Sequence, residues 1–183
     1  MTLALGLWVI ADVAEAAVIH VLEITHEHGE YRVDFVVRVQ APARSVYRVL
    51  TDYDRLERLS TVITAATLEA SSGPHRHRVS SVLEACVAWV CRTMTQVQAV
   101  TERPPRSVDA EILPGPSDFE RGHSRWRILE LDGGSTRLVY HATVVPDFWV
   151  PPVIGPWLIE RTFRRELVDA ARRLEELAAP SPP

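Results

Sequence analysis

Apolar and polar residues alternate strictly along residues 30–40. Every second position from Tyr31 to Val39 is apolar, and most of the positions between them carry a charge. This period of two residues predicts a strand with one buried face. A β-rich segment over residues 17–25 precedes this strand, and residues 26–29 between the two segments are predicted as a turn.

Two short helices are expected after this strand. Pro42 opens the first, because the missing N–H of proline costs nothing in the first helical turn. The second helix covers residues 54–59, and an antiparallel meander of strands separated by turn formers follows. Six strands are predicted there, over residues 62–70, 76–84, 92–101, 107–113, 122–130 and 136–145.

A long amphipathic helix is predicted over residues 152–178. Its apolar residues recur at spacings of three and four, and arginine and glutamate fill the other side. These apolar residues are Phe163, Leu167, Ala170, Leu174 and Leu177. Such a helix needs a sheet to pack against. A twisted sheet that curls around a helix does not touch it everywhere, so we expect a hollow between them, and apolar hollows bind apolar ligands.

Two segments resemble a known superfamily. The run from Val39 to Tyr53, with its Ala-Pro, Val-Tyr and Leu-Thr-Asp-Tyr steps, resembles the opening of START-like (SRPBCC) proteins of the polyketide-cyclase/dehydrase and coenzyme-Q-binding (COQ10-type) branches. The residues from Phe163 to Leu177 resemble their terminal helix. The resemblance implies an α+β helix-grip fold, in which a curved antiparallel sheet of about seven strands wraps a long C-terminal helix. It does not specify an activity, because this fold serves many functions.

The length of 183 residues fits one domain, predicted over residues 17–178 and followed by a tail at 179–183. Residues 1–16 resemble a secretory signal, with an apolar run and small residues near Ala16. They lack a cationic start, and Asp12 and Glu15 interrupt the pattern. Either this segment directs export, or it packs on the domain. A periplasmic or exported location is favoured over a cytoplasmic one.

Charge and motifs exclude several classes of function. The net charge is −4 and the basic residues are scattered, so no nucleic-acid partner is expected. All 20 basic residues are arginine, which excludes chemistry that depends on lysine. The histidine pairs His26/His28 and His75/His77 have no third ligand at zinc spacing, so no metal is expected. No cofactor fingerprint is present, and no cofactor is expected.

The residues expected to line the ligand site are apolar side chains on the predicted inner face, together with one serine and one tyrosine. The alternative for each of them is a place in solid core. They are Phe35, Val37, Val79, Ser81, Leu83, Trp126, Ile128, Leu138, Tyr140 and Ala142 of the sheet, and Ile154, Trp157, Leu158 and Phe163 of the terminal helix.

Three connections should meet at one end of the sheet, because successive turns of a meander alternate between its ends. They cover residues 85–91, 114–121 and 146–152, and the first and last are unusually apolar for loops. Trp89, Phe148 and Trp149 are therefore expected to form the rim of the site and to touch a membrane surface transiently. The alternative is that both loops fold inwards and complete the core.

Cys86 and Cys91 are the two cysteines of the chain. Positions five apart in one continuous strand point to opposite faces, so the two can form a disulfide only if the chain turns between them. Otherwise they remain two thiols.

The leading hypothesis is a binder or carrier of a hydrophobic small molecule such as a quinone, isoprenoid, lipid or polyketide-like ring. An aromatase/cyclase-type enzyme that acts in the same cavity is the alternative. A third hypothesis, an interaction module that binds a protein partner through its apolar loops, requires exposed loop tips and a filled interior.

Overall fold

The computed structural model describes residues 17–87, 90–151 and 155–179. Predictions for residues 1–16 and 180–183, for Trp89 and for Ile154 lie outside these residues. Eight strands form one antiparallel sheet with the order β1-β2-β8-β7-β6-β5-β4-β3. They are β1 (Val18–Glu27), β2 (Glu30–Val39), β3 (Ile63–Gly73), β4 (Arg76–Val87), β5 (Val90–Arg103), β6 (Ser107–Ile112), β7 (Phe119–Glu130) and β8 (Thr136–Pro146).

The sheet has eight strands where about seven were expected. The first strand, β1, covers the β-rich segment predicted over residues 17–25, pairs with β2 along nearly its whole length and forms one edge. The turn between them is His28-Gly29, and both residues have positive φ angles of 50° and 83°. Two consecutive residues with positive φ match the twist of a two-residue hairpin, and glycine adopts this conformation without strain.

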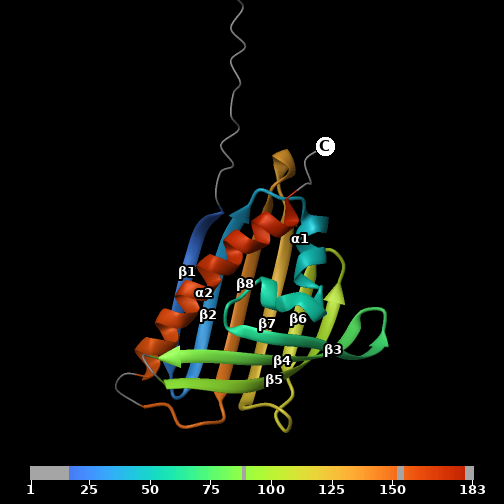
Figure 1. Ribbon diagram of the computed structural model, residues 1–183. Helices are drawn as coiled ribbons and strands as arrows, with labels where there is room; N and C mark the ends of the chain where they lie inside the picture. Colours follow the sequence, from blue (N-terminus) through green and yellow to red (C-terminus); the bar gives the residue numbers. More distant parts are fainter. Residues whose placement is uncertain (1–16, 88–89, 152–154, 180–183) are drawn as a thin grey trace, which may run out of the picture.

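The helical segments are α1 (Ala43–Leu50), the 3₁₀ segments η1 (Tyr53–Arg58) and η2 (Asp132–Gly134), and α2 (Gly155–Ala178). Figure 1 shows α2 lying across the sheet, with α1 beside its C-terminal end. No helix in the described part of the chain is long and apolar enough to cross a membrane.

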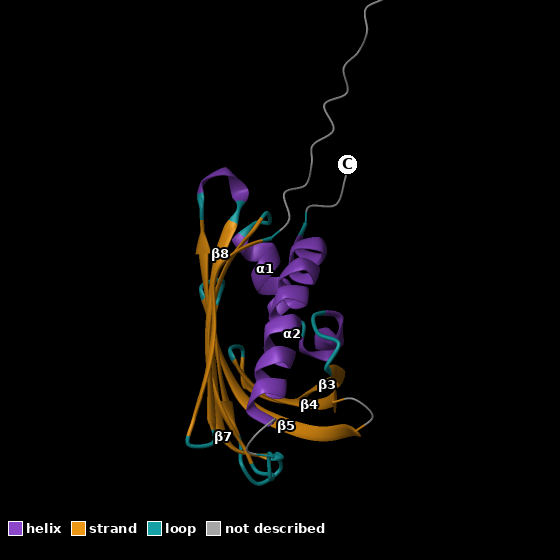
Figure 2. Cartoon of the chain, turned by 90° about the vertical axis from the view of Figure 1, so that its left-hand side faces the viewer, coloured by secondary structure: helices purple, strands orange, loops and turns teal. Residues whose placement is uncertain are grey.

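The sheet is strongly curved. In Figure 2 the strands β3, β4 and β5 turn away from the wall formed by the other strands and run beneath α2. The β3–β4 pair has three register shifts, and extra residues of this kind bend a strand and increase its twist. The concave face therefore surrounds the helix, as expected for a helix grip.

The main core lies between β2, β8, α1 and α2. Val33 to Val39 alternate as the sequence predicts, and their inward side chains are at most 1% exposed. On α2, Leu167, Ala171, Leu174 and Ala178 recur at four, three and four residues and pack into the same cluster. Burial of each large aliphatic side chain contributes about 1.5–3 kcal/mol. This end of the concave face is therefore the most firmly held part of the grip.

Candidate functional site

The register places all ten sheet residues expected to line the ligand site on one face. Phe35 lies opposite Tyr140, which lies opposite Trp126. Because side chains alternate between faces, the same parity continues through β6 and β5 to Val79 on β4. This face is the concave one, on the side of α1 and α2 (Figure 2). The ten are Phe35, Val37, Val79, Ser81, Leu83, Trp126, Ile128, Leu138, Tyr140 and Ala142.

One part of this face is closed by packing. Phe35, Val37 and Leu138 are at most 1% exposed and Ile128 is 4% exposed. All four belong to the core cluster that contains Leu167, Ala171 and Leu174 of α2. In this conformation they form solid core.

A second part remains accessible. Trp126 and Tyr140 stack with their ring centroids 4.2 Å apart and their planes inclined by 28°. Both residues are half-buried, as are Ser124 and Ala142 on the same face. We call Ser124, Trp126, Tyr140 and Ala142 the central surface. Phe163 of α2 is also half-buried and packs against the same core cluster.

The central surface carries one polar group suited to recognition. Burial raises the pKa of Tyr140 to about 12, although a hydrogen bond with Ser124 works in the opposite direction. The phenol therefore keeps its proton at neutral pH. Because it is protonated, the phenol carries an O–H that can donate a hydrogen bond.

The position of α2 explains why the central surface is accessible. The main contacts of α2 are with α1, β1 and β2, on one side of the sheet. Figure 1 likewise shows the helix in front of β1 and β2 rather than over β6 and β5. The helix therefore covers Trp126 and Tyr140 less completely than it covers the packed residues of β2.

The helix is fastened at its middle by a buried carboxylate. Glu166 is 8% exposed and accepts hydrogen bonds from the Ser60 hydroxyl at 2.9 Å, the Thr61 N–H at 3.0 Å and the Thr61 hydroxyl at 2.6 Å. Burial alone would raise the pKa of this carboxyl, but the hydrogen bonds from Thr61 and Ser60 outweigh it and hold the pKa below its ordinary value. Glu166 therefore ties α2 to the segment between η1 and β3.

The described parts of the three connections converge at the end of the sheet opposite η2. The Asp147 N–H donates to the Asp118 carbonyl at 3.1 Å, and the Arg92 guanidinium lies 4.0 Å from the centre of the Phe148 ring. Met94, Ile112 and Phe119 form a small buried cluster against which Phe148 packs. Phe148 is half-buried in this cluster, so its side chain folds inwards in part.

The two remaining described tryptophans lie at the surface. Trp149 is 78% exposed and Trp157 is 57% exposed. Trp157 was expected to line the site, but it lies on the outer side of the first turns of α2, with the Arg161 guanidinium 5.6 Å from its ring centre. Its neighbour Leu158 is half-buried. The helical period, which turns adjacent residues by about 100°, separates the two. Trp157 is thus a rim residue.

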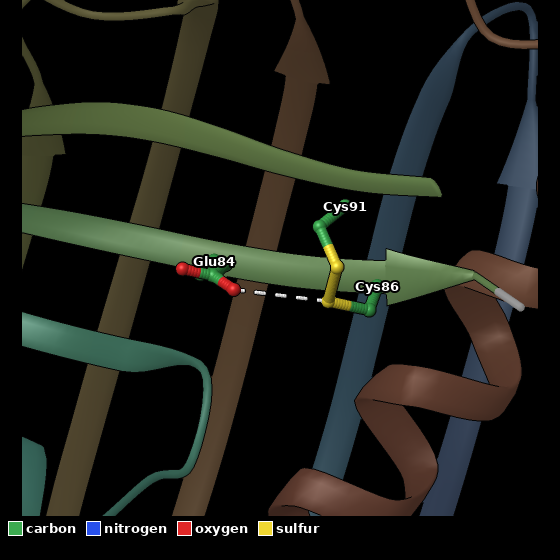
Figure 3. Close-up of side chains that lie close together, drawn as sticks. All are labelled: Glu84, Cys86 and Cys91. Carbon is green, nitrogen blue, oxygen red and sulfur yellow. Dashed lines mark hydrogen bonds between the residues drawn. A yellow bond between two sulfur atoms is a disulfide. The ribbon is translucent and has the colours of Figure 1, made fainter. Parts of the chain in front are cut away.

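The chain turns between Cys86 and Cys91, and the two form a disulfide across the β4–β5 hairpin (Figure 3). A carboxylate oxygen of Glu84 lies 3.8 Å from the Cys86 sulfur. These three residues offer ligand atoms close enough together for a metal ion. A disulfide sulfur has neither a proton nor a thiolate charge, so in this oxidised state the contact is not a hydrogen bond and the group is a poor metal ligand set. The disulfide joins the ends of β4 and β5 near the rim.

A buried polar cluster that the sequence pattern does not predict lies between η1 and the far strands. Glu102 of β5 is 8% exposed and accepts hydrogen bonds from the Tyr53 hydroxyl at 2.6 Å and from the Tyr47 hydroxyl. The Nε2 atom of His77 lies 3.3 Å from Glu102 Oε1. Burial, and then the hydrogen bond to Glu102, raise the pKa of both tyrosines, so both phenols remain donors. The sequence contains one indication of this cluster, because the alternation of β5 places the charged residue Glu102 on the inner face.

Two open hollows of about 450 Å³ and 220 Å³ lie on the convex side of the sheet. Outward-facing charged and polar residues line much of both, among them Glu30, Arg32, Arg121, His123 and His141. Both hollows are open to solvent, and neither lies between the sheet and α2, where the sequence predicts one.

A family model described as polyketide cyclase / dehydrase and lipid transport matches residues 30–179. No curated protein sequence matches the chain closely enough to count as a relative. Many solved structures resemble the chain at low sequence identity, which bears on the fold and not on the activity.

Three of these structures illustrate the range. The Zhui aromatase/cyclase from Streptomyces sp. R1128 is 20% identical with a TM-score of 0.65, over 81% of this chain and 93% of that one. A START superfamily protein from Mycobacterium smegmatis is 20% identical with a TM-score of 0.62, over 80% of this chain and 96% of that one. A fragment of a STAR-related lipid transfer protein from Xanthomonas axonopodis is 14% identical with a TM-score of 0.58, over 86% of this chain and 99% of that one. The predicted helix-grip fold is confirmed.

Proposed function

Because the chain belongs to the polyketide cyclase/dehydrase and lipid transport family, we propose that it binds a hydrophobic small molecule between the central surface and α2. The observation that supports this proposal is the accessible stack of Trp126 on Tyr140, on the concave face and beside the packed core. These side chains pack against the core on one side, and because they are only half-buried, part of their surface remains free for a ligand.

The burial of apolar area supplies the affinity. Each Å² removed from water contributes about 25 cal/mol, so a ligand that hides roughly 350 Å² gains about 9 kcal/mol before the entropic cost of association. The phenol of Tyr140 adds a directional contact. As a protonated donor it suits a carbonyl oxygen, which quinones, acyl chains and polyketide-like rings all carry. The coenzyme-Q-binding branch, like the other ligand classes, remains a hypothesis.

A protonated phenol at Tyr140 suits a carrier, in which it would hold a ligand carbonyl, and in the cyclase alternative it would act as a general acid. The fate of the ligand distinguishes the two. A ligand that is recovered chemically unchanged after incubation supports a carrier, and turnover supports a cyclase.

The test is recovery of the ligand from the protein as it is produced in cells. Native mass spectrometry of the full chain is expected to show a bound species of small mass, and solvent extraction should release an apolar molecule. After extraction, the protein should bind the fluorescent apolar probe N-phenyl-1-naphthylamine with saturable, micromolar affinity. A protein that carries no apolar molecule and fails to bind the probe would contradict the proposed function.

We also propose that the rim contacts a membrane surface while the ligand is transferred. Trp149 and Trp157 are the most exposed of the described large apolar residues, and Arg161 adds a positive charge beside Trp157. Tryptophan suits the interface between water and lipid, and arginine suits anionic headgroups.

The double variant Trp149→Ala/Trp157→Ala is expected to lower partitioning onto vesicles of phosphatidylcholine and phosphatidylglycerol by about tenfold or more, since each large apolar side chain contributes about 1.5–3 kcal/mol when fully buried. Vesicle co-sedimentation measures the effect. Leu129→Ala is the matched control, because Leu129 is 46% exposed on β7, away from the rim. Equal partitioning of the double variant and the parent protein would rule out the membrane contact.

A further inference from the structure

Ser71 and His77 lie opposite each other across the β3–β4 hairpin. The Ser71 hydroxyl oxygen is 2.9 Å from His77 Nδ1. Ser71 is exposed, and the His77 side chain is only 12% exposed. A hydroxyl that solvent can reach therefore lies against an imidazole that is largely buried.

The other ring nitrogen of His77 faces Glu102. The Nε2 atom lies 3.3 Å from Glu102 Oε1, and that carboxylate side chain is 7% exposed. Tyr53 and Tyr47 donate to the two oxygens of the same carboxylate and hold it in place from η1 and α1. The carboxylate is thus an acceptor surrounded by donors, which is the arrangement that a buried charge requires.

We assign the ring proton of the neutral imidazole to Nε2, the nitrogen beside the Glu102 carboxylate. In this tautomer Nδ1 keeps its lone pair and can accept a hydrogen bond from the Ser71 hydroxyl. The Ser71 hydroxyl, the His77 imidazole and the Glu102 carboxylate thus follow one another in the order that activates a serine nucleophile.

We propose that Ser71, His77 and Glu102 form an acyl-transfer site, in which Ser71 attacks small activated esters that reach the open hairpin. This site is independent of the proposed ligand surface. Ser71 is exposed and lies on β3, at the opposite edge of the sheet from β1 and β2, which α2 contacts.

The chemistry proceeds in two balanced steps. The Ser71 oxygen bonds to the acyl carbon while its proton passes to His77 Nδ1, and the bond from that carbon to the leaving oxygen breaks. The leaving alcohol takes the proton from Nδ1. Water then attacks the acylated Ser71 with His77 as base, which releases a carboxylic acid and restores the hydroxyl. Glu102 stabilises the transient positive charge on the imidazole and is a positioning residue.

The test uses the full chain and 4-nitrophenyl acetate. We expect a rapid initial release of 4-nitrophenol and an acetyl group on Ser71, located by peptide mass spectrometry. The chain has no lysine, so the usual background of acetylated lysine side chains is absent. Ser71→Ala should abolish the label at this peptide. His77→Gln should slow acylation by about a hundredfold, the order of a general base contribution.

Ser72→Ala is the matched control, because Ser72 is exposed beside Ser71 and is the next residue of the same hairpin. It should be acetylated as fast as the parent protein. The proposal is overturned if Ser71→Ala retains the initial release, or if Ser71 and Ser72 acquire the label at equal rates. Thermal unfolding of each variant verifies that the hairpin variants remain folded.

Discussion

Replacement of Glu102 by leucine is expected to lower the free energy of unfolding by about 3–5 kcal/mol, the usual result of removing one partner from a buried charged network. The loss has a local cause. Tyr53 and Tyr47 would keep buried hydroxyl donors without an acceptor, and each unsatisfied group costs about 1–3 kcal/mol. His77 would lose its partner at Nε2 as well.

Urea unfolding followed by tryptophan fluorescence measures this change. Glu111→Leu is the control, because Glu111 is an exposed glutamate on the neighbouring strand β6. It should change stability by less than about 0.5 kcal/mol, as most exposed substitutions do. If the two variants unfold at the same urea concentration, the cluster contributes nothing to the attachment of α1 and η1 to the sheet.

Replacement of Ala142 by tryptophan is expected to abolish binding of the apolar probe, with a loss in affinity of about a hundredfold or more. Ala142 shares the inner face of β8 with Tyr140, and Ser124 lies directly opposite it on β7. An indole at this position fills the space that the ligand is proposed to occupy. Overpacking of this kind costs about 1–3 kcal/mol, so the variant should remain folded while it loses binding.

The measurement is a fluorescence titration with N-phenyl-1-naphthylamine after solvent extraction, alongside a thermal melt. His141→Trp provides the comparison, since His141 is the adjacent residue on the convex side and is exposed. That variant should bind the probe as the parent protein does. Unchanged affinity in Ala142→Trp would place the ligand elsewhere in the molecule.

Two buried carboxylates fasten the helices to the rest of the fold. The Glu166 carboxylate fastens α2 to the segment at Ser60 and Thr61, and the Glu102 carboxylate fastens α1 and η1 to the far strands. Both are buried acids whose hydrogen-bond donors come from distant parts of the chain. Together they set the spacing between helices and sheet within which the central surface stays accessible.

Much of the fold follows from local periodicity. The two-residue alternation of residues 31–39 determines the inner face of β2, and the spacing of Leu167 and Leu174 determines the packed side of α2. His28-Gly29 determines a tight hairpin. The alternation of side chains along β7 and β8 then places Trp126, Tyr140 and Ala142 on the concave side, because side-chain direction in a strand depends only on the count of residues.

Which parts of that face are solid and which are accessible depends on the tertiary structure. Phe35 and Trp126 have the same parity, yet one is buried against α2 and the other remains half-exposed, because the helix leans towards β1 and β2. The outward position of Trp157 likewise depends on how α2 is rotated on the sheet. The grouping of Ser71, His77 and Glu102 required the pairing of three strands. A sequence pattern specifies the direction of each side chain within one helix or strand. The distances between elements depend on how their surfaces pack, and no local period encodes that packing.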